Sequence, residues 1–241
     1  MKIAFISDIH GNAIALDAVL QDIHNKNVDK IIVLGDISYR GPEPKRALDI
    51  IRSLKTDVIK GNADEWVVRG IKEGEVPEKA REMMTKERDW IVSKLDEQDL
   101  NYLKTLPKEH SIQLTDNISI QVFHATPNSL FEVVLPDEDA EEIKEKMMGQ
   151  NDASIYLYGH IHQPYVRYIQ GKVIANVGSV GLPFDGLPQA SYMLVEEKEG
   201  QFNITNQRVK YDIEKVVKQY HDLAYPNATF MSQVIRNGSL N

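Results

Sequence analysis

Seven side chains in this sequence carry oxygen or nitrogen atoms that can bind divalent metal ions, and each follows an apolar run. They are two aspartates, one asparagine and four histidines: Asp8, His10, Asp36, Asn62, His124, His160 and His162. Mixed carboxylate, amide and imidazole ligands without sulfur suit Mn, Fe, Zn, Co or Ni. Seven ligands are enough for two adjacent ions. A pair about 3.5–4 Å apart suits displacement at phosphorus, because it clamps the phosphoryl oxygens and generates hydroxide at neutral pH.

The apolar runs in the first third of the chain are typical of buried β-strands that alternate with helices. Strands are expected at Lys2–Ile6, Lys30–Leu34 and Thr56–Lys60, and helices at Ala13–Asn25 and from Pro42 to about Leu54. This βαβαβ order implies parallel strands with right-handed crossovers. In such sheets ligands collect beyond the carboxyl ends of the strands, which is where Asp8, Asp36 and Asn62 fall.

The middle of the chain, from Glu65 to Pro107, is charged and helix-forming and carries both tryptophans, Trp66 and Trp90. We expect it to form a helical lobe, about 65–107, inserted over the site of a single domain that spans residues 1–241. The tryptophans could stack on a nucleobase, but buried aromatic residues usually belong to the core, and we favour that interpretation.

The remaining residues predict a second set of strands. These are expected at His110–Leu114, Ile118–Phe123, Ser154–Tyr158, Tyr165–Ile169, Lys172–Asn176, Ala190–Glu196 and Gln201–Arg208. Helices are expected from about Asp137 to Met148 and near Ile213–Tyr220, followed by a looser tail.

The order Asp-x-His, Gly-Asp, Gly-Asn, His, Gly-His-x-His resembles the calcineurin-like metallophosphoesterase superfamily, and most of all its small bacterial and archaeal single-domain phosphodiesterases and phosphatases. Gly35–Gly41 is similar to the family's Gly-Asp-x-x-x-Arg-Gly segment, and Asn176–Ser179 to its Asn-Pro-Gly-Ser stretch, with Val177 in place of proline. The matches run from Met1 to about Ala190. The resemblance implies an α/β fold in which two packed mixed β-sheets are flanked by helices, in four layers.

The resemblance also implies which residues hold which ion. One ion would bind Asp8, His10, Asp36 and His162, and the other would bind Asp36, Asn62, His124 and His160. Asp36 would bridge the two, since a carboxylate can bind two cations at once. Family habit favours manganese, and hydrolysis would proceed by attack of a metal-bridging hydroxide.

Three further residues are predicted to bind the substrate. Arg40 can grip a phosphate with two parallel hydrogen bonds and, with Asp36 and Asn62, is assigned to catalysis; alternatively it pairs with Glu43. Gly11 and Asn12 precede a predicted helix, whose N-terminal N–H groups favour anions, although Asn12 is also an ordinary helix cap.

The sequence departs from the family at Ala63, where most members have a histidine after the asparagine. That histidine is thought to stabilise the transition state or protonate the leaving oxygen, and general acid help is worth about 10²–10⁴-fold. We therefore expect phosphodiesters, phosphoanhydrides and activated aryl esters to be better substrates than simple alkyl monoesters.

Composition excludes some classes of function. The formal charge is −8, which argues against a duplex nucleic acid partner. No apolar stretch approaches the roughly 20 residues of a membrane helix, and the absence of cysteine favours a cytoplasmic location. The expected substrate is a phosphorylated small molecule or nucleotide, and an oligomer is possible. Alternatives are a phosphoprotein phosphatase, a dinucleoside polyphosphate hydrolase or, in another class, a non-catalytic phosphate-binding scaffold.

Overall fold

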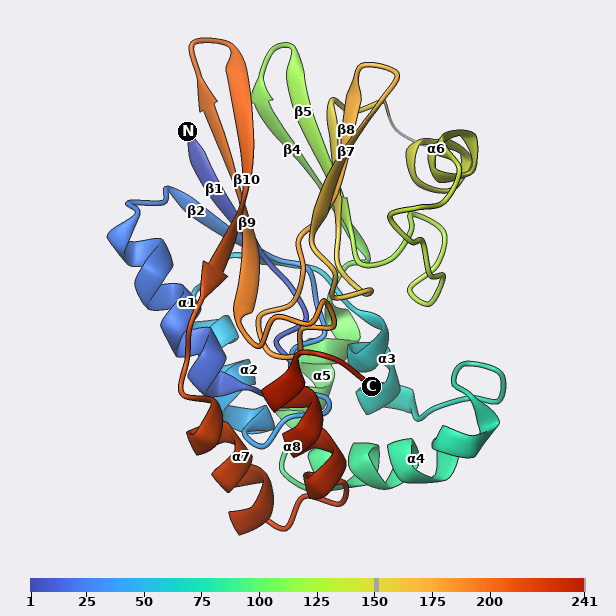
Figure 1. The fold of residues 1–241 in the computed structure, drawn as a ribbon. Helices are drawn as coiled ribbons and strands as arrows, with labels where there is room; N and C mark the ends of the chain where they lie inside the picture. The colour runs from blue at the N-terminus through green and yellow to red at the C-terminus, as the bar shows by residue number, and fades with distance from the viewer. Residues whose placement is uncertain (150–151, 241) are drawn as a thin grey trace.

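The structure is a computed structural model that describes residues 1–149 and 152–240. Its centre is two mixed five-stranded β-sheets that pack face to face (Figure 1). The first sheet has the strand order β10-β9-β1-β2-β3 and the second has the order β4-β5-β6-β8-β7. The prediction of two packed mixed sheets flanked by helices is confirmed.

The first sheet is built from both ends of the chain. Its strands are β1 (Lys2–Ile6), β2 (Lys30–Val33), β3 (Asp57–Val58), β9 (Ala190–Lys198) and β10 (Gln201–Val209). The pairs β1–β2 and β2–β3 are parallel, as the βαβαβ pattern predicts, whereas β1–β9 and β9–β10 are antiparallel. Side chains alternate along β1: Ile3 and Phe5 face the second sheet, while Ala4 and Ile6 face the helices. Both faces are buried, which explains why the strand is apolar throughout.

The second sheet comes from the second half of the chain. Its strands are β4 (Glu109–Thr115), β5 (Ile118–Phe123), β6 (Ile155–Tyr158), β7 (Tyr165–Ile169) and β8 (Lys172–Asn176). The three central strands β5, β6 and β8 are parallel, and the edge strands β4 and β7 are antiparallel to their neighbours. Helix α6 (Ala140–Met148) packs on its outer face through Ile143 and Met147. The layers are therefore helix, sheet, sheet, helix.

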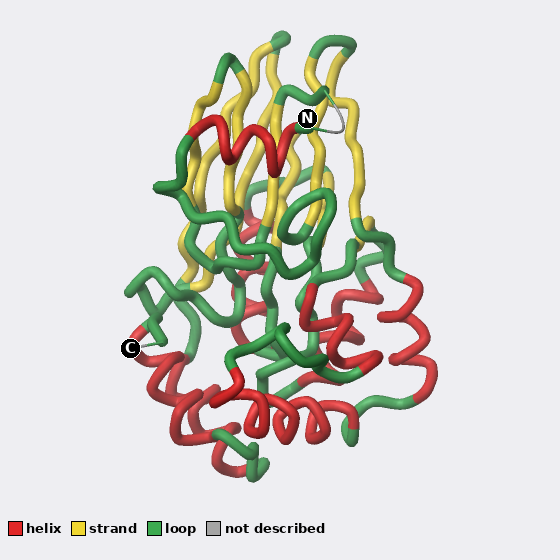
Figure 2. The backbone as a smooth tube through the Cα atoms, turned by 90° about the vertical axis from the view of Figure 1, so that its right-hand side faces the viewer, coloured by secondary structure: helices red, strands yellow, loops and turns green. Residues whose placement is uncertain are grey.

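The other helices gather against the first sheet and at the carboxyl ends of the strands, opposite the hairpin turns (Figures 1 and 2). They are α1 (Ala13–Asn25), α2 (Pro44–Ser53), α3 (Asn62–Arg69), α4 (Glu78–Val92), α5 (Glu97–Thr105), α7 (Ile213–Asp222) and α8 (Ala228–Asn237). Helices α3–α5 occupy most of the segment predicted as a lobe, and they share one apolar core with α1, α2, α7 and α8. Trp66 is buried against Tyr39 and Phe131, and Trp90 packs on Tyr225, so the core interpretation of both tryptophans is confirmed.

Several predicted boundaries are wrong. Strand β3 has two residues instead of five. The chain leaves the sheet by Lys60, because the Lys60 N–H donates to Pro107 O and not to a neighbouring strand. Helix α2 begins at Pro44 and not at Pro42, and α6 begins at Ala140, with Asp139 as its cap. The expected loose tail contains α8. Among the described residues, no helix combines the length and apolar composition needed to cross a membrane.

Candidate metal centre

The seven predicted ligands all come from the carboxyl ends of parallel strands. Asp8 and His10 follow β1, Asp36 follows β2, and Asn62 follows β3 as the first residue of α3. His124 follows β5 directly, and His160 and His162 follow β6. Both sheets therefore contribute, because the carboxyl ends of their parallel strands meet at the same end of the molecule.

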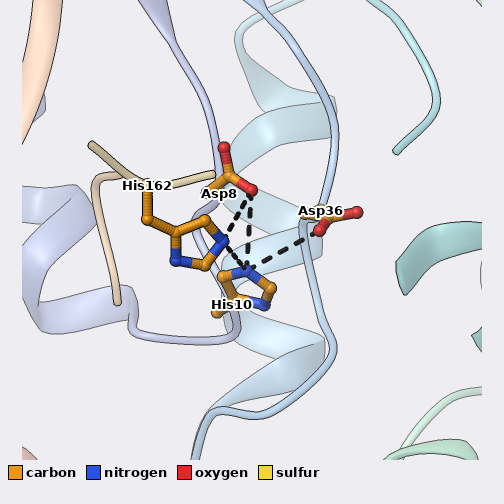
Figure 3. Close-up of side chains that lie close together, drawn as sticks. All are labelled: Asp8, His10, Asp36 and His162. Atoms are coloured by element: carbon orange, nitrogen blue, oxygen red, sulfur yellow. Dashed lines mark hydrogen bonds and ion pairs between the residues drawn. The ribbon is translucent and has the colours of Figure 1, made fainter. Parts of the chain in front are cut away.

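One group of four side chains forms the first half of the site. The ligand atoms of Asp8, His10, Asp36 and His162 lie within 4.8 Å of one another, and all four residues are buried. His162 Nε2 is 3.0 Å from Asp8 Oδ1 and 3.1 Å from His10 Nε2. Figure 3 shows the four side chains pointing toward a common centre. This is the ligand set that the resemblance implies for one ion.

The remaining ligands form a second group beside the first. Asn62 Oδ1 lies 2.9 Å from His124 Nε2 and 2.8 Å from His160 Nδ1. An amide oxygen here can bind a cation, whereas an amide nitrogen in the same place would donate to both histidines and, at 3.2 Å, to Asp36 Oδ2. Rotation of the Asn62 amide would therefore present its oxygen to a bound ion, or its nitrogen to the two histidines when no ion is bound.

Asp36 joins the two groups through a single oxygen. Its Oδ2 is 3.7 Å from His10 Nε2 in the first group and 3.5 Å from His124 Nε2 in the second. Its other oxygen, Oδ1, accepts a hydrogen bond of 2.7 Å from the Ala63 N–H. The carboxylate is therefore oriented by the start of α3, with one oxygen placed between the two groups.

Backbone carbonyls orient three of the four imidazoles. The Nδ1 atoms of His10 and His124 lie 2.8 Å and 2.7 Å from Tyr39 O and Leu34 O, and His162 Nδ1 contacts Leu182 O. Because a carbonyl only accepts, each Nδ1 carries the proton and each Nε2 faces the cluster. With both protons on Nδ1, the Nε2 lone pairs of His10 and His162 would point at each other across 3.1 Å. A shared cation relieves that repulsion, so these residues fit a metal.

The charges of the cluster support the same conclusion. Burial by itself would raise the pKa of Asp8 and Asp36, but the neighbouring histidines outweigh burial and lower both. Burial by itself would lower the pKa of His124, but Asp36, helped by Asp8 and the Leu34 carbonyl, outweighs burial and raises the pKa to about 10. Burial lowers the pKa of His160 to about 4. The metal-free cluster thus keeps two carboxylates ionised and holds a proton on His124 that a cation can replace.

The backbone at the site is strained. Asp8, His10, Asp36, His160 and His162 all have positive φ, between 49° and 68°. Residues other than glycine rarely adopt this conformation, and each such residue costs on the order of 1–3 kcal/mol. Five of the seven predicted ligands share it, which indicates that the fold holds these loops in place for their side chains.

Asp64 is an important residue that the sequence analysis did not assign to the site. Its buried carboxylate accepts hydrogen bonds from the N–H groups of Asp36 (2.8 Å), Ile37 (2.9 Å) and Gly61 (2.9 Å). Asp64 therefore ties the loop after β2 to the start of α3. An aspartate at the third position of a helix is a capping signal, which was visible in the sequence.

The predicted substrate-binding residues have other contacts in the structure. The Gly11 N–H donates to Ile37 O, and the Asn12 N–H donates to Ile9 O. The Asn12 side chain caps α1 through Ala15 N–H and donates to Gly181 O. These bonds favour the cap alternative for Asn12 and leave phosphate binding by both residues without support.

Arg40 pairs with an acidic residue that the sequence analysis did not predict. Its Nε donates to Glu87 Oε2 at 3.3 Å, whereas Glu43 pairs with Arg46. The alternative pairing of Arg40 with Glu43 is therefore wrong. A contact between Arg40 and a substrate phosphate stays a prediction.

Comparisons with known proteins agree with this geometry. The calcineurin-like phosphoesterase superfamily domain matches residues 1–200. The uncharacterized protein MJ0912 of Methanocaldococcus jannaschii is 32% identical over 237 residues, which cover 90% of each chain. A crystal structure of a metallophosphoesterase from Sphaerobacter thermophilus has 27% identity and a TM-score of 0.78, covering 99% of each chain.

A further relative is the phosphodiesterase YfcE of Escherichia coli, which is 24% identical over 204 residues, 81% of this chain and 88% of YfcE. The family and the buried cluster of aspartates and histidines together indicate binding of divalent metal. This chain therefore belongs to the calcineurin-like phosphoesterase superfamily and is a metal-binding phosphoric ester hydrolase.

Proposed function

We propose that the enzyme holds two divalent metal ions, manganese by preference, and hydrolyses phosphodiester, phosphoanhydride or activated phosphate ester bonds. The observation that carries this proposal is the position of Asp36 Oδ2, 3.7 Å from His10 Nε2 and 3.5 Å from His124 Nε2. A carboxylate oxygen shared by two groups of ligands is what a pair of bridged ions requires. The substrate we propose is a phosphorylated small molecule or a nucleotide.

The ions, when bound, supply a hydroxide nucleophile from water and neutralise charge on the phosphoryl oxygens. The residues of the chain do the rest. Asp8, Asp36 and the histidines fix the ions, and Asp36 is itself held by the Ala63 N–H. Asn62 Oδ1 lies beside His124 within the second group. Arg40 would donate to the substrate phosphate. Hydroxide would attack phosphorus directly, the P–O bond to the leaving group would break, and no phosphoenzyme would form.

The leaving oxygen receives no proton from residue 63, because the buried Ala63 has no titratable group. This supports diesters and activated esters over alkyl monoesters as substrates. The name of the E. coli relative, a phosphodiesterase, also supports diesters.

The proposal is tested by metal titration and a substrate panel. The metal-free protein is titrated with Mn²⁺, and bound metal and hydrolysis of a bis-aryl phosphate are measured together. We expect two ions per chain, and activity that follows their binding. Parallel assays of a phosphopeptide and a dinucleoside tetraphosphate separate phosphodiesterase activity from the phosphoprotein phosphatase and polyphosphate hydrolase alternatives.

His162→Ala is expected to lose one ion and most of the activity, because it removes a ligand from the first group. His24→Ala is the matched control, since His24 is exposed on α1 away from the cluster. A protein that binds two ions but hydrolyses none of these substrates would support the scaffold alternative and refute the enzymatic proposal.

A further inference from the structure

Glu87 is a buried charged residue that lies outside the metal cluster and contacts the loop after β2. It is on α4, fully buried at 0% exposure, and 47 residues from Arg40 in sequence. Its Oε2 accepts from Arg40 Nε at 3.3 Å, and its Oε1 accepts from Asn227 Nδ2 at 3.1 Å. Both oxygens of the carboxylate are therefore engaged, on opposite sides.

The loop that Glu87 contacts also orients the metal cluster. The Tyr39 hydroxyl lies 3.4 Å from Glu87 Oε2 and 3.1 Å from Met84 O, so the Tyr39 side chain is anchored on α4. The carbonyl of the same residue, Tyr39 O, accepts the Nδ1 proton of His10 at 2.8 Å. Helix α4 is thus connected through one residue to an imidazole of the cluster.

Arg40 is held on its backbone as well as on its side chain. The Tyr220 hydroxyl of α7 donates to Arg40 O at 2.7 Å, and Arg40 has a φ of 75°. A left-handed conformation is unfavourable for arginine and persists only where surrounding contacts impose it. Tyr220 thus holds the Arg40 backbone, while Glu87, itself bonded to Asn227, holds the Arg40 side chain.

The geometry at the guanidinium suits a bound anion. The hydrogen bond with Glu87 uses the Nε atom of Arg40. The two terminal nitrogens are not used by this bond, and together they can donate in parallel to a phosphoryl group. The Arg40 side chain retains 17% exposure, whereas Glu87 has none. The Arg40 side chain is therefore mostly buried but not fully enclosed, whereas the carboxylate that holds it is fully enclosed.

We propose that Glu87 is a positioning residue: it orients Arg40 toward the substrate phosphate and, through Tyr39, steadies the carbonyl that orients His10. The inference rests on the proposed function, because Arg40 as a phosphate ligand is part of it. A buried ion pair contributes little net stability compared with apolar residues of similar volume, so a role in positioning is a better reason for this pair than stability.

The test measures binding of inorganic phosphate to the Mn²⁺-saturated protein by calorimetry, together with kcat/KM for a bis-aryl phosphate. Glu87→Gln keeps the size of the side chain and removes the charge that holds Arg40. We expect phosphate affinity to fall about tenfold to hundredfold, the usual effect of losing a charged hydrogen bond, with the Mn²⁺ stoichiometry unchanged. Glu87→Asp, which keeps the charge, should recover part of the loss.

Asp99→Asn is the matched control. Asp99 is also fully buried, and its two ion-pair partners, Lys45 and Arg52, both lie on α2 and not in the loop after β2. This variant should lose stability and keep its phosphate affinity. Equal losses of phosphate affinity in Glu87→Gln and Asp99→Asn would show a general effect of buried charge and overturn the inference.

A double-mutant cycle decides whether Glu87 acts through Arg40. Glu87→Gln should weaken phosphate binding in the wild-type background and have no further effect in an Arg40→Ala background. The same loss in both backgrounds overturns the inference, as does an Arg40→Ala variant that binds phosphate normally. Hydrolysis by the wild-type protein is measured separately, so failure of the proposed function is distinguishable from failure of this inference.

Discussion

The substitution Asp36→Asn tests the idea that one carboxylate serves both ions. Asparagine keeps the size of the side chain and can still accept from the Ala63 N–H, so the loop conformation should survive. What is lost is the negative charge between His10 and His124. The variant therefore isolates the electrostatic contribution of Asp36.

The size of that contribution follows from His124. Burial alone lowers the pKa of His124, yet Asp36, with smaller contributions from Asp8 and the Leu34 carbonyl, raises it from 6.5 to about 10. A change of this size corresponds to roughly 5 kcal/mol, at about 1.4 kcal/mol for each tenfold step. A divalent ion carries twice the charge of an imidazolium, so the loss in metal affinity should be at least about a thousandfold for each ion.

Three measurements check this prediction. Calorimetry should show two bound Mn²⁺ ions in the wild type and no tight pair in Asp36→Asn. Hydrolysis of a bis-aryl phosphate should fall by a factor of about a thousand or more. In the metal-free variant, NMR titration should place the pKa of His124 below about 10, because the group that raises it most is lost while Asp8 and the Leu34 carbonyl remain. A variant that binds both ions with wild-type affinity would refute the bridging role, while Asp99→Asn, which alters a buried carboxylate away from the cluster, should bind metal normally.

Three further predictions concern pH, leaving group and packing. Because the pKa of His124 is about 10 in the metal-free protein, an ion must displace its proton, and Mn²⁺ affinity should rise about tenfold per pH unit up to that value. Calorimetry in buffers of different ionisation enthalpy should detect the released proton. An affinity independent of pH would contradict this prediction. With alanine at position 63, alkyl diesters should react at least about a hundredfold more slowly than aryl diesters under metal saturation, and equal rates would disprove the leaving-group argument. Gly41→Ala would place a Cβ on the His10 carbonyl oxygen, so we expect a loss of about 3 kcal/mol in unfolding free energy and weaker metal binding. Gly149→Ala is the control, because the nearest contact of its added Cβ is at 3.3 Å, and it should have little effect on either quantity. A stable Gly41→Ala variant with normal metal affinity would show that the backbone can move at this position.

The boundaries that were mispredicted have identifiable causes. The tail after α7 was expected to be loose, yet Met231, Val234 and Ile235 have helical spacing and Gly238 ends α8 in a left-handed conformation. That pattern is visible in the sequence and was sufficient to predict α8. The shortening of β3 could not be predicted, because it depends on the contact between Lys60 and Pro107, which are 47 residues apart.

The partner of Arg40 shows the same limit. Glu43 is three residues away and was the natural local choice, but Arg40 pairs with Glu87 on α4. Local spacing cannot specify which buried acid a loop arginine meets, since that depends on how the lobe packs on the first sheet. The same holds for Gly11 and Asn12, whose hydrogen-bonding groups are used by neighbouring loops of the fold.

The amino-acid sequence by itself predicted the set of candidate ligands, their order and the strands that precede them. Each ligand stands next to an apolar run, and parallel strands bring their carboxyl ends to one edge. Only the tertiary structure decided how the two groups meet at Asp36 Oδ2 and which carbonyls orient the imidazoles. It also decided that five ligands lie in the left-handed region. These features arise from contacts between segments up to 152 residues apart, such as the approach of His10 Nε2 to His162 Nε2. Local propensity carries no information about contacts over such separations in sequence.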